Sequence, residues 1–103
     1  MFGTLCRMRP RPGQEAAVAE LYRRWDRERR PRVPGALAAY LYRPRQRLDE
    51  LIGVVVFESE DSYVANANDP EQDRWYRQLR ELLEADPEWD DGDVLLAAFW
   101  GER

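Results

Sequence analysis

The sequence contains no histidine and only one cysteine, Cys6. Without histidine the chain lacks the commonest protein ligand for transition metals and the usual axial ligand of haem. We therefore expect no metal site and no bound cofactor. A single cysteine cannot form a disulfide within the chain, so Cys6 is expected to be a small buried hydrophobic residue.

Long apolar runs are also missing, since no stretch approaches the about 18 residues that a membrane-spanning helix requires. The first ten residues, MFGTLCRMRP, show no basic segment followed by a long apolar stretch, which is the pattern of a secretory signal. We therefore expect a cytoplasmic protein with no membrane partner. At 103 residues, with 44% hydrophobic and 35% charged residues, the chain is expected to form a single globular domain over residues 1–103.

Lysine is absent too, and all sixteen basic residues are arginine. Residues 1–48 contain twelve arginines and four acidic residues, whereas residues 49–103 contain four arginines and sixteen acidic residues. The two halves thus have formal charges of +8 and −12, in a chain whose net charge is −4. Because an acidic half of similar size can pair with the basic half, we expect no nucleic-acid partner.

Four segments are predicted to be β-strands. MFGTLCRM and GALAAYLYR are short, rich in apolar and aromatic residues, and bounded by Pro or Gly. ELIGVVVFE, residues 50–58, is apolar on both faces, so both faces must be covered. The fourth strand is predicted as DVLLAAFWG, residues 93–101, after a turn signal in DDG. The preceding EWDDGD is predicted to be a solvated turn, because it lacks the spacing of a calcium-binding loop.

Helices are predicted between the first two strands and after the third. In the first helix, Val18, Leu21, Tyr22 and Trp25 form one apolar stripe, and Pro31 is expected to end it.

After the third strand, Ser59 is expected to cap a short helix. Asp69 is expected to cap a second helix, with Pro70 at its first position and Gln72 completing a capping box. Trp75 begins the apolar stripe of this second helix. We predict that the break between the two helices flanks the mouth of a pocket.

The resulting βαββαβ order predicts a ferredoxin-like α+β fold with a four-stranded antiparallel sheet. One RNA-binding module has the same order, but its consensus aligns with ELIGVVVF only at Gly53, Val55 and Phe57, which are ordinary core residues. Two helical segments can cover only one face of such a sheet. Something outside the chain is expected to cover the second, apolar face.

Four segments carry a family resemblance: PGQEAAVAELYR, VPGALAAYLYR, VVVFESEDSYVA and PEWDDGDV. Together they make the chain resemble the antibiotic biosynthesis monooxygenase (ABM) superfamily of dimeric α/β-barrel proteins. The resemblance implies a homodimer formed through the open sheet face, with a small-molecule pocket between sheet and helices in each subunit. It includes haem-degrading members, but these use an Asn, Trp and His set, and this chain has no histidine.

The resemblance directs attention to five residues. Asn66 and Tyr40 are the candidate catalytic residues, since their side chains can hydrogen-bond to a phenol or quinone oxygen. The predicted ligand-binding residues are Tyr40, Tyr63, Asn66, Trp75 and Trp100. Three of them have a structural alternative: Asn66 as a helix-terminating residue, Trp75 as core, and Trp100 as part of barrel closure or the dimer interface.

The function expected from the resemblance is that of an ABM-like oxidoreductase. Its specific form is a cofactor-independent monooxygenase acting on a planar aromatic or quinone-type small molecule, where the substrate anion reduces oxygen itself. The alternative is a dimeric α/β-barrel protein that binds a small ligand, or serves a structural role, without catalysis. The sequence shows no clear base that would decide between them.

Overall fold

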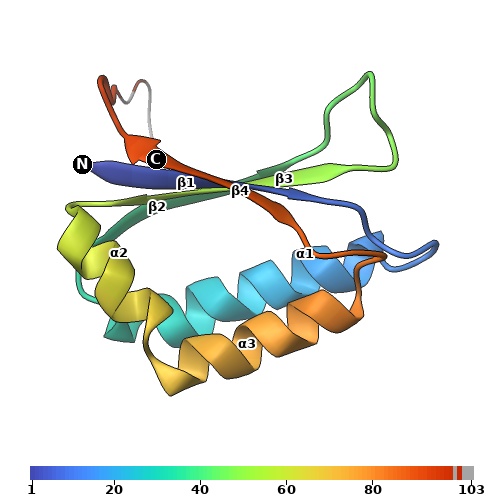
Figure 1. Ribbon diagram of the computed structural model, residues 1–103, viewed down its shortest axis with the longest axis horizontal. Helices are drawn as coiled ribbons and strands as arrows, with labels where there is room; N and C mark the ends of the chain where they lie inside the picture. Colours follow the sequence, from blue (N-terminus) through green and yellow to red (C-terminus); the bar gives the residue numbers. More distant parts are fainter. Residues whose placement is uncertain (99, 101–103) are drawn as a thin grey trace.

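A computed structural model describes residues 1–98 and 100. It contains a four-stranded antiparallel sheet with the order β2-β3-β1-β4, and the helices lie together on one face (Figure 1). This is the predicted ferredoxin-like α+β fold, and in the single chain the sheet is open rather than closed into a barrel. The strands are β1 (Phe2–Met8), β2 (Ala36–Tyr42), β3 (Leu51–Phe57) and β4 (Glu88–Asp93).

The central strands β1 and β3 give the sheet two different faces. Thr4 pairs with Val55 and Cys6 pairs with Gly53 across the two strands, and all four residues face the helices. The burial pattern of β1 alternates strictly between buried and half-buried, as expected for a strand with one covered face. The prediction that β3 carries apolar residues on both faces is confirmed.

The prediction for the fourth strand was wrong. β4 is formed by EWDDGD, which was expected to be a turn, and the predicted strand 93–101 shares only Asp93 with it. Residues 99 and 101–103 of that prediction lie outside the described residues. Trp89 pairs with Cys6 and Asp91 pairs with Thr4. Acidic residues have low strand propensity, but an edge strand leaves them in contact with solvent, so pairing with β1 decides the conformation.

The first helix is less regular than predicted. α1 (Glu15–Arg24) continues as a π-helix, η1 (Trp25–Arg29), and ends with a 3₁₀ turn, η2 (Arg30–Arg32). Its predicted apolar stripe is confirmed, with Val18 fully buried and Trp25 8% exposed. π-helical turns are rare and often occur at functional sites, so η1 marks this end of the helix as a candidate part of a site.

The predicted helix break is also present, between α2 (Glu60–Ala67) and α3 (Pro70–Glu81). Ser59 caps α2, and the Asp69 side chain caps α3 by accepting a 2.9 Å hydrogen bond from the Glu71 amide. The predicted capping box with Gln72 is not formed. The Gln72 side chain instead accepts a hydrogen bond from the indole N–H of Trp25 on η1.

Between the sheet and the helices lies a tightly packed cluster, here called the packed end. It is formed at the C-terminal end of β1, the start of β3, the first part of α1 and the end of α3. Every side chain in it is at most 5% exposed. Its members are Met8, Val18, Leu51, Leu79 and Leu83.

The opposite face of the sheet carries no helix (Figure 1). Tyr40 pairs with Val54 and Tyr42 with Ile52 on this face, and the two tyrosines are 56% and 50% exposed. Within the described residues, no helix is long and apolar enough to cross a membrane.

Several ion pairs join the arginine-rich and acid-rich halves, as predicted. Arg7 pairs with Asp90 at 3.2 Å, and Arg29 pairs with Glu71 at 3.2 Å. Other arginines find partners nearby in their own half, such as Arg27 with Glu20. The charge asymmetry of the sequence is therefore compensated partly by local pairs and partly by pairs across the fold.

Candidate functional site

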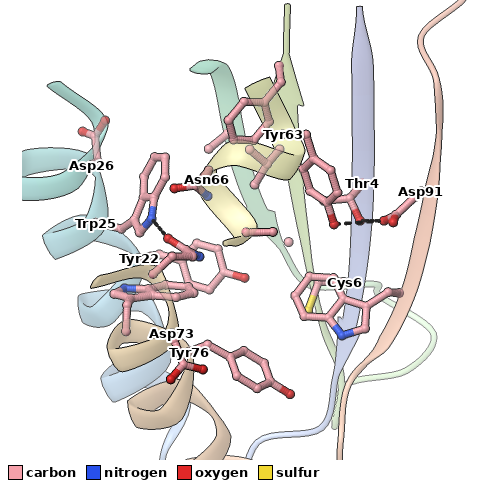
Figure 2. Close-up of a pocket in the computed structure, with 18 residues that line it drawn as sticks. Thr4, Cys6, Tyr22, Trp25, Asp26, Tyr63, Asn66, Asp73, Tyr76 and Asp91 are labelled. Carbon is pink, nitrogen blue, oxygen red and sulfur yellow. Dashed lines mark hydrogen bonds between the residues drawn. The ribbon is translucent and has the colours of Figure 1, made fainter. Parts of the chain in front are cut away.

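A cavity of about 570 Å³ lies at the other end of the layer between sheet and helices, here called the hollow end (Figure 2). Its size falls in the range of pockets that bind small molecules. Strands, helices and the π-helical turn all contribute side chains to it. The lining residues are Thr4, Cys6, Tyr22, Trp25, Asp26, Ala39, Gly53, Val55, Phe57, Tyr63, Asn66, Ala67, Gln72, Asp73, Trp75, Tyr76, Trp89 and Asp91.

Aromatic rings form much of the cavity wall, and hydrogen bonds hold two of them in place. The Trp75 indole N–H donates a buried 3.0 Å hydrogen bond to the Leu21 carbonyl oxygen, and its ring meets Tyr22 edge to face at 5.2 Å. The Trp25 indole N–H donates a 2.8 Å hydrogen bond to Gln72 Oε1, which joins η1 to α3. These rings are anchored by their polar edges and cannot rotate freely into the cavity.

Tyr22 reaches the sheet only because residue 53 is glycine. A Cβ atom added to Gly53 would lie 2.5 Å from the Tyr22 hydroxyl oxygen. That hydroxyl lies 3.9 Å from Met8 Sδ.

The buried Cys6 thiol and Tyr22 hydroxyl both hold their protons. Burial raises the pKa of Cys6 to about 12, although a hydrogen bond with Tyr22 acts to lower that pKa, and burial also raises the pKa of Tyr22. Both groups stay protonated at neutral pH and are not suited to act as base or nucleophile.

A carboxylate held by two hydroxyl groups lies on the β4 side of the cavity. Thr4 Oγ1 donates a 2.5 Å hydrogen bond to Asp91 Oδ1, and the Tyr63 hydroxyl donates a 3.3 Å hydrogen bond to the same oxygen (Figure 2). Burial raises the pKa of Tyr63, so this hydroxyl remains a donor at neutral pH. Within residues 1–98 and 100, no arginine forms an ion pair with Asp91. Asp91 is thus a candidate base with accessible lone pairs.

Asn66 presents a hydrogen-bond donor to the cavity. Its Oδ1 accepts a 2.8 Å hydrogen bond from Nη2 of Arg29, and Arg29 is only 8% exposed. A guanidinium group can only donate, so the amide oxygen must face Arg29 and the amide nitrogen must face the other way. In Figure 2 the Asn66 side chain borders the cavity with its nitrogen toward the space between helices and sheet.

Arg29 also joins three helical segments of the single helical layer at this point. Its Nη1 lies 3.5 Å from an Asp69 carboxylate oxygen and 3.2 Å from one of Glu71, both at the start of α3. Its Nε is buried and has no hydrogen-bond partner among the described residues. Arg29 therefore links the π-helical turn, the end of α2 and the start of α3 next to the cavity.

A family model described as Antibiotic biosynthesis monooxygenase matches residues 1–78. The chain belongs to this family. The ABM resemblance inferred from the four sequence segments is confirmed, and the matched residues contain β1, β2, β3, α1, α2 and most of α3, which together form most of the cavity wall. None of the curated proteins compared with the sequence matches it.

Solved structures share the ABM fold along nearly the whole chain. SnoaB, a cofactor-independent oxygenase from Streptomyces nogalater solved as a point mutant, has a TM-score of 0.79 at 17% identity, covering 93% of this chain and 94% of its own. Rv0793 from Mycobacterium tuberculosis has a TM-score of 0.75 at 21% identity, covering 95% and 98%. A conserved protein from Methanosarcina mazei Go1 has a TM-score of 0.78 at 13% identity, covering 88% and 89%. At these identities the likeness concerns the fold alone.

The five predicted site residues of this ABM protein do not share one location. Tyr63, Asn66 and Trp75 all line the cavity, and residues on both sides of the α2–α3 break do so as well. Tyr40 lies on the opposite face of the sheet beside Val54, so it cannot contact a ligand in this cavity. Trp100 is 84% exposed and is not among the lining residues.

Sequence reasoning missed two polar residues of the site. Asp91 was predicted to lie in a turn, and the only signal for its position is the alternation of Trp89, Asp91 and Asp93 along β4. Arg29 was not singled out, and nothing in its spacing indicates burial. In the part of the chain that the structure describes, no cluster of three or more Cys, Asp or Glu side chains is placed to hold a metal ion.

Proposed function

We propose that this ABM protein is a cofactor-independent monooxygenase that acts on a planar aromatic or quinone-type small molecule in the hollow-end cavity. The observation that carries the proposal is the combination of flat aromatic walls with one donor, the Asn66 amide, and one acceptor, the Asp91 carboxylate. SnoaB, which shares the fold, is itself named as a cofactor-independent oxygenase.

In the proposed reaction Asp91 removes a proton from an acidic position of the bound substrate. The Asn66 N–H stabilises the resulting anion by donating to its oxygen, as other preorganised donors do for developing negative charge. The electron-rich anion then reduces molecular oxygen. One oxygen atom becomes the new carbonyl oxygen of the product, the other leaves as water with the two hydrogens of the oxidised CH2 carbon, and the substrate supplies all four electrons that reduce O2. Trp75 and Tyr22 hold the ring system and exclude bulk water.

Oxygen consumption with anthrone as substrate tests this function. We expect uptake by the wild-type protein above a boiled control, and a loss of at least about tenfold for Asp91→Asn and for Asn66→Ala, within the usual range for acid–base and oxyanion contacts. Binding of anthrone without oxygen uptake would assign the protein to the non-catalytic, ligand-binding alternative.

We further propose that the protein is a homodimer in which the open sheet faces meet. This face carries Leu5, Tyr40, Val54 and Val56 without any helix over them. A contact of about 800 Å² per subunit would reach the standard size of a stable interface. Light scattering should give twice the chain mass at micromolar concentration, and Val54→Asp should give monomeric or insoluble protein, because it places a charge in an apolar layer. A folded wild-type monomer at that concentration would contradict the dimer.

A further inference from the structure

The ionisable side chains that line the cavity are unevenly distributed. Three of the lining residues are aspartates, Asp26, Asp73 and Asp91. No arginine is among the lining residues, although the chain contains sixteen arginines. An excess of one charge sign around a pocket favours ligands of the opposite charge or of no charge over ligands of the same charge.

Two of the three carboxylates are neutralised nearby. Asp26 on η1 pairs with Arg30 on η2 at 2.7 Å, and Asp73 pairs with Arg77 within α3 at 2.9 Å. Asp91 receives only neutral donors, the hydroxyl groups of Thr4 and Tyr63, from the described residues. The uncompensated negative charge of the cavity is therefore that of Asp91.

Asp91 also retains capacity to accept a hydrogen bond from a ligand. A carboxylate offers about four lone-pair sites on two oxygens, and both protein donors use Oδ1. Asn66, from α2, offers an N–H donor fixed by Arg29. A ligand that satisfies both groups has a hydroxyl donor on one side of its ring system and an oxygen acceptor on another.

We infer that the cavity selects an uncharged planar aromatic ligand with a hydroxyl group directed at Asp91, and that Asp91 excludes ligands that carry a carboxylate. This inference deepens the proposed function, because it assumes that the cavity binds a small aromatic molecule. The proton that Asp91 would remove in catalysis then comes from a neutral substrate that ionises only after binding. An anionic ligand would place two like charges in the same pocket.

The size of the discrimination follows from Coulomb's law. Two like charges about 8 Å apart at an effective dielectric constant of about 20 repel enough to weaken binding roughly tenfold to thirtyfold. The cavity is open to solvent on one side, so part of this repulsion is screened. The ratio between the dissociation constants of an anionic and a neutral ligand should therefore fall as salt is added.

The test compares 2-naphthol with 2-naphthoate by isothermal titration calorimetry at pH 7 and low salt. The two probes share one ring system, and at this pH the first is neutral and the second anionic. For the wild-type protein we expect naphthoate to bind at least about tenfold more weakly. Asp91→Asn keeps an oxygen acceptor for Thr4 and Tyr63 but removes the charge. The ratio of the naphthoate Kd to the naphthol Kd should therefore fall to about threefold or less.

Asp90→Asn is the matched control, since it changes the net charge equally on the adjacent β4 residue, which faces the other side of the sheet. It should leave the ratio near the wild-type value. If naphthol and naphthoate bind the wild-type protein equally well, the charge selection is wrong while the binding cavity stands. If Asp90→Asn lowers the ratio of the two Kd values as much as Asp91→Asn does, Asp91 is not the residue that discriminates against anionic ligands. If neither probe binds, the proposed function of the cavity itself fails.

Discussion

At the packed end of the molecule Val18, Leu79 and Leu83 are fully buried, whereas at the hollow end the same sheet and the same helices enclose a cavity of about 570 Å³. α1, α3, β1 and β3 each run from one end to the other. The difference therefore does not come from the fold, which is shared, but from the side chains along each element.

The packed end contains aliphatic side chains and methionine, whose shapes adapt to one another until no space is left. The hollow end contains rigid rings whose polar edges are tied to the surrounding protein. The Trp75 indole N–H donates a hydrogen bond to the Leu21 carbonyl oxygen, and the Trp25 indole N–H donates one to Gln72 Oε1. A ring held in this way cannot move inward to fill a void without breaking a hydrogen bond. Anchored aromatic residues thus keep a pocket open inside a small domain.

The largest effect is expected when the packed end is opened. Leu79→Ala should lower the free energy of unfolding by about 3 kcal/mol, because it removes buried methyl groups and leaves a cavity that the neighbours only partly fill. Urea denaturation followed by circular dichroism measures this change. A loss below about 1 kcal/mol would show that the packed end is as loosely packed as the hollow end, and would contradict the difference in packing between them.

The second effect is expected where the sheet and the cavity wall meet. In Gly53→Ala the new methyl group would lie 2.5 Å from the Tyr22 hydroxyl oxygen, so the ring must shift toward the cavity. We expect a loss of about 2 kcal/mol in stability, typical of an overpacked site, together with weaker binding of 2-naphthol.

Tyr22→Phe provides the control for this substitution. In the double variant the shortest clash is removed, so the stability loss should be smaller than the sum of the two single losses. Strictly additive losses would mean that the close approach of Tyr22 to Gly53 does not constrain the wall.

The sequence predicted the packed end better than the hollow end, for physical reasons. Apolar periodicity in α1 and the continuous apolar run of β3 report burial directly, so Val18 and Leu51 were placed correctly. Asp91 and Arg29 are polar residues whose positions depend on pairing with distant segments. Edge pairing with β1 and burial beneath the α2–α3 break are tertiary effects, which local patterns do not contain.

Asn66→Asp tests the polarity of the hollow end with little change in shape. The new carboxylate keeps an oxygen toward Arg29, so the free energy of unfolding should change by less than about 1 kcal/mol. It also replaces the N–H donor with an acceptor, so a quinone oxygen loses its hydrogen bond. We expect 1,4-naphthoquinone to bind about tenfold more weakly, measured by calorimetry. Unchanged binding would mean that the Asn66 amide does not contact the ligand.

The smallest effect is expected from removing a single hydroxyl group at the cavity wall. Tyr63→Phe deletes the 3.3 Å hydrogen bond to Asp91 but leaves the ring in contact with Phe57, at a centroid distance of 5.6 Å. The loss in stability should stay below about 1 kcal/mol, and the Kd for 2-naphthol should change by about threefold, because Thr4 still holds the carboxylate. Tyr40→Phe removes the same atom from the opposite sheet face and should leave this Kd unchanged. If Tyr40→Phe alters binding in the cavity as strongly as Tyr63→Phe, the ligand is not held by the hollow end, since the two hydroxyl groups lie on opposite faces of the sheet.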